Sequence, residues 1–368
     1  MIWILIPTLL FGLPLLLVFG SFAWHNSQTK GLAYFGRPKV QRERFHHQVQ
    51  VIGRLLRPII RLMAGRNPDP NQFTVKRGEW YFPANACSKA SLDFACNYEP
   101  QANDVFVVTP MKCGTTWMQQ IVYETLMKGE GDFSDSGHRH LFATSPWLES
   151  FNGVPLAEAP LLGSQQLRLI KSHLPAAACP FSESAKYIYV MRHPGSCFAS
   201  SVDFFRANAG DLSPTPETML DWFCSDRMWW GSWPKHVGGF YERHQKYSNV
   251  LFISFEDMKA DLPGVIERVA EFLNVDLTEP QYLAIQRKSS FSYMKEHEEQ
   301  FEMLAPGFFA TGDSFFPSGS ANRFDALSPQ VQTRISEYVR AELQGDDFPL
   351  ADFYPDVAEV SQSKPQQR

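Results

Sequence analysis

The stretch Asp104-Val-Phe-Val-Val-Thr-Pro-Met-Lys-Cys-Gly-Thr-Thr-Trp117 decides the fold of this chain. An apolar run leads into a short polar turn, and a helical pattern follows from Trp117 to about Lys128. The turn contains a lysine, a glycine and two threonines, which together with the free N–H groups of a helix N-terminus suit a bound anion. The pattern predicts a strand, an anion-binding loop and a helix in direct succession.

The loop differs from the P-loop of nucleoside triphosphate enzymes in the position of its lysine. A P-loop needs a glycine, then four residues, then Gly-Lys-Ser or Gly-Lys-Thr, and the chain contains no Gly-Lys pair. Here Lys112 precedes Gly114 instead of following it. This order of residues argues against a nucleotide kinase or NTPase. That reading stays an alternative, as does an inactive, membrane-tethered nucleotide-binding module.

The loop resembles the 5′-phosphosulfate loop of sulfotransferases, which is usually written Pro-Lys-Ser-Gly-Thr-Thr-Trp. Met111 and Cys113 stand where the family usually has proline and serine. The resemblance implies that the glycine and the two threonines cradle a 5′-phosphate. The matching residues, implied to bind the cofactor, are Lys112, Gly114, Thr115, Thr116 and Trp117.

A second motif, Leu169-Ile-Lys-Ser-His-Leu-Pro175, places a lysine and a histidine at the end of another apolar run. A histidine there can take up a proton at neutral pH, although a histidine that merely caps a strand is the simpler reading of this motif alone. The segment is similar to the Lys-Thr-His-Leu-Pro of cytosolic-type sulfotransferases. The resemblance implies that His173 is the general base, and that Lys171 and Lys112 stabilise charge on the transferred group and on the leaving phosphate oxygen.

A third motif, from Tyr187 to Ser200, ends a strand pattern in arginine and continues through a Pro-Gly turn into a helix. Arginine binds phosphate oxygens in a bidentate way. Arg192 and Ser200 have the spacing of the 3′-phosphate motif of the same family. Two separate phosphate sites fit 3′-phosphoadenosine 5′-phosphosulfate (PAPS) as the cofactor, and these residues require no metal.

The resemblance also extends to the adenine end of the cofactor. It implies that Trp117 and Phe291 enclose the base and that Ser289 touches it, whereas an aromatic pair by itself is more often part of a core. The family usually continues with Arg-Lys-Gly-x-x-Gly-x-Trp-Lys, but residues 316–324 read Phe-Pro-Ser-Gly-Ser-Ala-Asn-Arg-Phe. Arg323 is therefore the one basic residue of this stretch that can bind the 3′-phosphate.

The activity implied is transfer of a sulfuryl group from PAPS to a hydroxyl or amine of a small acceptor. Composition adds only that the acceptor region is rich in phenylalanine, which suits an apolar phenol, sterol or lipid alcohol. A net charge of −5 argues against nucleic acid as a partner. The six cysteines show no Cys-x-x-Cys spacing, so neither a zinc site nor a disulfide framework is predicted.

The globular part alternates short apolar runs with helical patterns, which predicts an α/β, P-loop-like three-layer fold with a central parallel sheet flanked by helices. Predicted strands are Asp104–Thr109, Leu167–Lys171, Lys186–Met191 and Val250–Ser254. Predicted helices are Trp117–Lys128, Cys197–Arg206, Glu217–Arg227, Pro234–Tyr247, Leu262–Leu273, Pro280–Arg287 and Pro329–Leu343. The three motifs fall at the carboxyl ends of predicted strands, where such sheets bind ligands.

The N-terminal segment predicts a membrane attachment. Residues 2–24 carry no charge and would span roughly 34 Å as a helix, enough for the hydrocarbon core. A cleaved signal peptide is the alternative, with Ser-Phe-Ala at 21–23 as its cleavage site. Nine Lys or Arg residues in 25–66 predict a single-pass membrane protein whose catalytic domain is cytoplasmic.

The basic segment after this anchor contains an amphipathic helical pattern over residues 51–63, interrupted by Pro58. Its apolar stripe would contact either membrane lipid or the catalytic domain. Residues 67–71 are predicted to be a hinge. The domain organisation predicted is a transmembrane anchor (1–24), a basic juxtamembrane segment and linker (25–71), a sulfotransferase domain (72–360) and a disordered tail (361–368).

Overall fold

The computed structural model describes residues 34–133, 140–302 and 323–359. At its centre lies a four-stranded parallel sheet with the strand order β4-β3-β5-β6. The carboxyl ends of β3 and β4 are in register, with Val108 opposite Ser172. The strands are β3 (Asp104–Val108), β4 (Arg168–Ser172), β5 (Lys186–Met191) and β6 (Val250–Ser254).

The sheet is buried on both faces because apolar side chains alternate between two hydrophobic clusters. One cluster takes Val105, Val107, Leu169, Ile188, Val190 and Ile253. The other takes Phe106, Val108, Ile170, Tyr187, Tyr189 and Phe252. Each strand therefore reads as a continuous apolar run, as expected for a parallel sheet between two helical layers.

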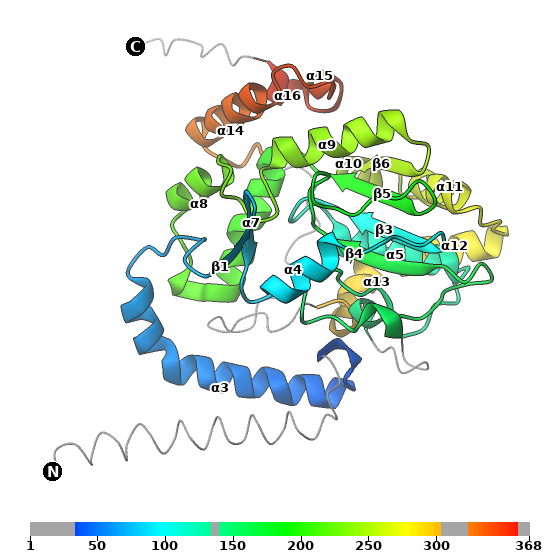
Figure 1. The fold of residues 1–368 in the computed structure, drawn as a ribbon, viewed down its shortest axis with the longest axis horizontal. Helices are drawn as coiled ribbons and strands as arrows, with labels where there is room; N and C mark the ends of the chain where they lie inside the picture. The colour runs from blue at the N-terminus through cyan, green and yellow to red at the C-terminus, as the bar shows by residue number, and fades with distance from the viewer. Residues whose placement is uncertain (1–33, 134–139, 303–322, 360–368) are drawn as a thin grey trace.

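Helices cover both faces and complete three layers (Figure 1). The cluster around Val105 is covered by α5 (Thr115–Leu126), α11 (Leu262–Leu273), α12 (Glu279–Lys288) and α13 (Phe291–Glu296). The opposite cluster is covered by α4 (Lys89–Cys96), α7 (Pro194–Ala209), α8 (Pro216–Phe223), α9 (Trp233–Lys246) and α14 (Pro329–Glu342). The predicted α/β class with a central parallel sheet is confirmed.

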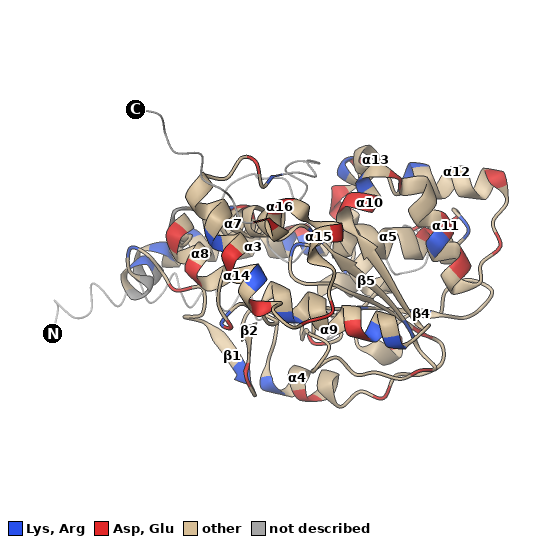
Figure 2. Cartoon of the chain, turned by 90° about the horizontal axis from the view of Figure 1, so that it is seen from above, with Lys and Arg blue, Asp and Glu red and all other residues tan. Residues whose placement is uncertain are grey.

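Further elements complete the described structure. Figure 2 shows basic and acidic residues interspersed along the outer helices α9, α11 and α12. The remaining described elements are η2 (Tyr34–Gly36), α3 (Lys39–Ala64), β1 (Thr74–Arg77), β2 (Trp80–Pro83), α6 (Leu141–Thr144), η3 (Leu156–Glu158), η4 (Gly210–Leu212), α10 (Phe255–Ala260), η5 (Glu298–Gln300), α15 (Leu350–Phe353) and α16 (Pro355–Ala358).

Helix α3 runs along one side of the molecule and continues through Pro58 (Figure 1). Its N-terminal half contacts the domain, where Phe45 packs against the cluster that contains Phe142 and Ala143, and Arg42 donates to the Glu299 carbonyl at 3.0 Å. Leu62, near its other end, is 85% exposed. The apolar stripe predicted over residues 51–63 lies in the C-terminal half, where Leu55 is 50% exposed, so lipid and the catalytic domain both stay predictions for it.

The predicted hinge at residues 67–71 is tied to the domain. The Asn67 side chain donates to the Thr218 hydroxyl at 2.6 Å, and Asp69 pairs with Arg227 at 2.6 Å. These polar contacts place the segment beside α8, and the hinge stays a prediction. The dipeptides Asn-Pro and Asp-Pro signalled a turn, but a turn can be anchored by its own polar side chains.

The predicted single-pass membrane location is corrected by the structure. Across residues 34–133, 140–302 and 323–359, no helix combines the length and apolar character that crossing a bilayer requires. The longest described helix, α3, carries arginines along its length, including Arg42, Arg54 and Arg61, and charge is costly in hydrocarbon. The predicted anchor (1–24) and tail (361–368) lie outside the described residues.

Candidate active site

The first motif forms a tight loop between β3 and α5. Gly114 caps the helix with a φ of 91°, and Lys112 also has a positive φ of 66°. Such a conformation is unusual for a lysine and is found where the surrounding structure enforces it, often at functional sites. A Cβ at Gly114 would lie 2.6 Å from Cδ2 of Phe255, so the loop also needs glycine for space.

Replacing Gly114 with alanine is expected to destabilise the protein by about 1–3 kcal/mol, because a left-handed backbone and a clash with Phe255 are combined. The measurement is the free energy of unfolding in urea. Gly345→Ala is the matched control, since Gly345 has a φ of 88° but nothing within 4 Å of the added Cβ. If the two variants lose equal stability, the close approach of Phe255 does not matter.

The histidine of the second motif lies at the carboxyl end of β4, beside this loop. Its Nδ1 is 2.9 Å from the Thr109 carbonyl oxygen, which can only accept, so Nδ1 carries the proton and Nε2 keeps its lone pair. Burial lowers the pKa of His173 well below 6.5, and the charge of Lys171 lowers it further. His173 is therefore neutral at physiological pH and has the tautomer of a general base at Nε2.

A threonine at the end of β3 links the histidine to the loop. The Thr109 hydroxyl lies 2.5 Å from the Thr115 hydroxyl and 3.3 Å from Nδ1 of His173. The first and second motifs therefore share one hydrogen-bonded network, although they lie far apart in the sequence. Thr116 follows as the second residue of α5 and is half-buried.

Two lysines contribute positive charge to this region. Lys171 is 2% exposed, and burial lowers its pKa to about 7, against the opposing effect of Glu149. Burial and the neighbouring Arg192 lower the pKa of Lys112 to about 8. Its ammonium lies 4.6 Å from the centroid of the Phe204 ring. Lys171 is buried and Lys112 is half-buried, so each interacts more strongly with an anionic ligand than it would in bulk water.

A buried acid that the motifs did not reveal supports the second motif. Glu149 is fully buried and accepts hydrogen bonds from the His173 backbone N–H (2.7 Å), the Ser172 hydroxyl (3.0 Å) and Nε1 of Trp147 (2.6 Å). Burial raises the pKa of Glu149, and these bonds oppose that shift. In sequence it is one acid in a variable stretch, and only its aromatic neighbour Trp147 distinguishes it from a solvated glutamate.

The arginine of the third motif reaches the first loop. Nη1 of Arg192 donates to the Lys112 carbonyl at 3.2 Å, and its guanidinium lies 4.3 Å from the centroid of the Phe255 ring. The residue is 6% exposed. Ser200 lies two turns into α7 and is half-buried. All three motifs thus meet at one edge of the sheet, at the carboxyl ends of β3, β4 and β5.

Arg323 lies against α7 but is engaged by an acid. Its guanidinium pairs with Asp203 at 2.5 Å, and its backbone N–H donates to the Ser196 hydroxyl at 3.1 Å. Asp203 comes one helical turn after Ser200, so the arginine does lie along the helix of the third motif. Its charge is balanced by Asp203, which the sequence prediction did not consider.

The residues predicted for adenine are partly brought together. Nε1 of Trp117 donates to the Ser289 carbonyl at 2.7 Å. The Ser289 hydroxyl is buried and has no hydrogen-bond partner among the described residues. Phe291 begins α13 and is 38% exposed, whereas the ring that packs edge-on against Trp117 is Phe255, at 5.5 Å between centroids.

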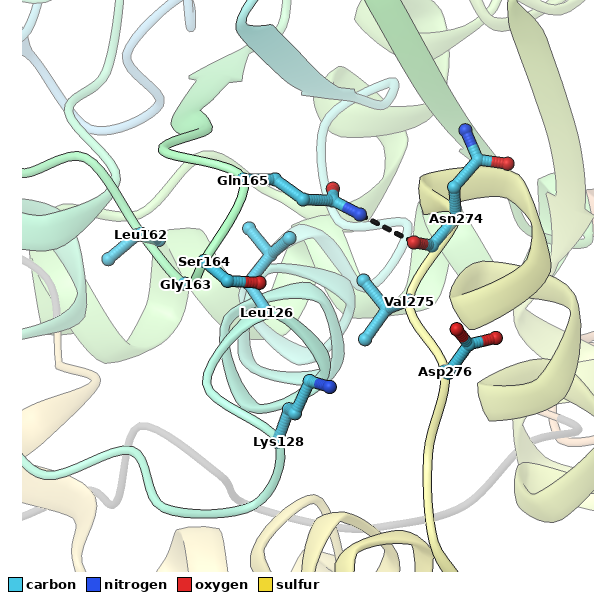
Figure 3. Close-up of a pocket in the computed structure, with 9 residues that line it drawn as sticks. All are labelled: Leu126, Lys128, Leu162, Gly163, Ser164, Gln165, Asn274, Val275 and Asp276. Carbon is cyan, nitrogen blue, oxygen red and sulfur yellow. Dashed lines mark hydrogen bonds between the residues drawn. The ribbon is translucent and has the colours of Figure 1, made fainter.

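A small cavity of about 120 Å³ lies elsewhere in the molecule (Figure 3). Leu162 and Gln165, which line it, precede β4, so the cavity lies at the amino ends of the strands, away from the three motifs. Gln165 closes one side through a hydrogen bond to the Asn274 carbonyl. Its lining includes none of the predicted site residues.

Comparison with solved structures identifies the fold. The structure resembles mouse sulfotransferase SULT7A1 complexed with PAP, with a TM-score of 0.59 and 22% identity over 75% of this chain and 96% of that one. It also resembles a retinol dehydratase in complex with androsterone and the inactive cofactor PAP, with a TM-score of 0.57 and 19% identity over 73% of this chain and 88% of that one. Both likenesses concern the fold.

Comparison of sequences identifies the family. The chain is 30% identical to human sulfotransferase 2A1 over 67% of its own length and 87% of that protein. It is also 30% identical to a 3-alpha-hydroxysteroid sulfotransferase of Cavia porcellus, over 61% of this chain and 82% of the relative. The profile of the sulfotransferase domain matches residues 102–347, which include all three motifs. This chain belongs to the sulfotransferase domain family.

Proposed function

We propose that this protein transfers a sulfuryl group from PAPS to the hydroxyl of a small, apolar acceptor. The observation that carries the proposal is the placement of His173. Its Nδ1 is fixed on the Thr109 carbonyl, and the Thr109 hydroxyl lies 2.5 Å from that of Thr115 in the anion-binding loop. A base with a free Nε2 thus lies directly beside a site suited to phosphate and sulfate oxygens.

The described residues fit PAPS in three respects. Gly114 is the N-cap of α5, and the first N–H groups of a helix have no partner within the helix, so they suit an anion. Lys112 and Arg192 place positive charge around the same loop. The buried Ser289 hydroxyl, which lacks a hydrogen-bond partner among the described residues, lies beside Trp117, where the adenine is proposed to bind.

The reaction proposed is an in-line displacement at sulfur. PAPS supplies the sulfuryl group and a bisphosphate leaving group. Nε2 of His173 removes the acceptor proton as its oxygen attacks. Lys112 and Lys171 stabilise the negative charge that develops on the transferred group and on the departing phosphate oxygen. This stabilisation is strongest in a site with little water. Gly114, Thr115 and Thr116 hold the 5′-phosphate, and Arg192 and Ser200 hold the 3′-phosphate.

The proposed acceptor is a sterol or another apolar alcohol. The His173 ring packs against two indoles, with centroids 5.3 Å from Trp147 and 5.0 Å from Trp230, and the two indoles also contact each other, at 5.7 Å. These flat apolar surfaces border the position where an acceptor hydroxyl would reach Nε2. Relatives named as hydroxysteroid sulfotransferases support the same class. We assign the activity to a domain comprising residues 72–360.

The test is the thermal stability of the full chain titrated with 3′-phosphoadenosine 5′-phosphate, with ATP-Mg²⁺ as the comparison. A ligand that binds only the folded state, present at 100 times its Kd, adds about 2.7 kcal/mol and raises the melting temperature by several degrees. We expect this shift with the bisphosphate. A shift with ATP-Mg²⁺ alone, or with neither ligand, would overturn the PAPS site.

A further inference from the structure

The ammonium of Lys171 is enclosed by two aromatic rings. Nζ lies 3.8 Å from the Trp147 ring centroid and 4.5 Å from that of Phe142. The faces of such rings attract cations, and the rings also keep water away. Trp147 belongs to the loop that carries Glu149, whereas Phe142 belongs to the single turn α6 and is 1% exposed.

One wall of this enclosure is supported from outside the matched family domain. Residues 34–64, which comprise η2 and α3 and are called here the N-terminal strap, precede the matched range 102–347. The Phe35 ring of the strap packs edge-on against Phe142, with 5.0 Å between centroids. It also lies 4.8 Å from His140, which caps α6 by accepting the Phe142 backbone N–H at 3.1 Å.

The strap is fixed to the domain by buried polar contacts. The Tyr34 hydroxyl lies 2.6 Å from Nε2 of His46, within the strap. Arg42 is only 2% exposed and donates to the Arg37 carbonyl at 2.9 Å and to the Glu299 carbonyl at 3.0 Å. Of these contacts, the bond from Arg42 to the Glu299 carbonyl joins the strap to the domain, and the other two brace the strap internally.

We propose that Phe35 is a positioning residue of this active site: it holds Phe142 against Lys171 and thereby keeps the ammonium dry and in place. The proposal rests on the function proposed above, because the strap would affect activity through Lys171, which the proposed reaction uses. Phe35 is too well buried, at 3% exposed, to act on substrate directly. Its contact with both Phe142 and the cap of α6 means that losing the ring weakens the packing that holds that wall.

The experiment is competitive acetylation of lysines in the free, full-length protein with acetic anhydride between pH 6 and 11, followed by peptide mass spectrometry. In Phe35→Ala we expect the labelling rate of Lys171 at pH 11, where its amine is largely unprotonated, to rise by about tenfold or more, because removing a core ring opens the wall to water. We also expect its titration midpoint to move up, toward 10.5, as the ammonium becomes hydrated. Glu149, Lys112 and Cys87 act on Lys171, and Lys171 in turn lowers the pKa of His173; none of these titratable groups is changed by the substitution.

Two controls separate positioning from general loosening. Phe35→Leu keeps an apolar side chain against Phe142 and should label like the unsubstituted protein. Lys112 is an internal control, because its ring partner is Phe204 rather than a residue of the strap. If Phe35→Ala fails to fold, Phe142→Leu, which keeps bulk but removes the ring face, should give the same exposure of Lys171.

Unchanged labelling of Lys171 in Phe35→Ala, or an equal rise at Lys112 and Lys171, would overturn the proposal. In Phe142→Leu, unchanged labelling would overturn it as well. Labelling needs neither donor nor acceptor. A negative result would therefore differ from failure of the bisphosphate to stabilise the protein, which tests the proposed function itself.

Discussion

Replacing His173 with alanine is expected to lower kcat by about 10²- to 10⁴-fold, the range typical for loss of a general base. The affinity for 3′-phosphoadenosine 5′-phosphate should stay the same, because the imidazole faces the acceptor in the proposed reaction. Two measurements are needed: single-turnover transfer from PAPS to a 3-hydroxysteroid acceptor, and the melting-temperature shift with the bisphosphate. The second measurement shows that the variant is folded and still carries its cofactor site.

The matched control for His173→Ala is His244→Ala. His244 lies near the end of α9, and its Nδ1 lies 2.8 Å from the carbonyl of Val250, at the amino end of β6 and so at the opposite edge of the sheet. This variant should keep full turnover. The base assignment is wrong if His173→Ala retains normal turnover, or if both variants lose the same activity together with stability.

The sequence predicted the sheet well because each parallel strand is buried on both faces and therefore consists of an almost uninterrupted apolar run. β5 and β6 begin and end at the predicted residues, β3 ends one residue earlier than predicted, and β4 begins and ends one residue later. The hairpin of Thr74–Arg77 and Trp80–Pro83 was missed, since four-residue strands are too short to show a period.

Site residues could be predicted where a motif fixes backbone geometry, and not where only tertiary contacts create the role. Lys112, Gly114 and Arg192 lie within short segments whose conformation the local sequence determines, and the structure brings them together. Glu149 acquires its partners only when the loop at Trp147 folds against β4. No pattern in one sequence marks a buried acid of this kind.

The N-terminal region shows a different kind of error, in which a visible pattern was misinterpreted. Its charge pattern was read as a membrane flank, but charge pattern alone does not distinguish a surface on lipid from a surface on protein. Arg42, counted as one of the flanking cations, is buried at 2% exposure and donates to carbonyls of both the strap and the domain. An arginine can be buried in this way because its planar head donates several hydrogen bonds at once.

Replacing Glu149 with glutamine is expected to move the alkaline limb of kcat/KM to lower pH. Burial already lowers the pKa of Lys171 to about 7, and the Glu149 carboxylate raises it. Without that charge the pKa of Lys171 falls further, so the lysine is neutral over more of the neutral range and activity at pH 7.5 decreases. A drop of one pKa unit corresponds to about 1.4 kcal/mol and roughly tenfold less ammonium above the limb.

Glutamine is the informative substitution because it nearly keeps the shape and hydrogen bonds of the acid. Its carbonyl can still accept from the His173 N–H and from Trp147, and the Ser172 hydroxyl can turn to accept from the amide. Glu149→Ala instead leaves those buried donors and the Lys171 ammonium uncompensated and should cost about 3–5 kcal/mol of stability. A glutamine variant with an unshifted pH profile would show that Glu149 acts on this site through shape alone. A shifted profile with an unchanged melting temperature would show that its charge sets the protonation of Lys171.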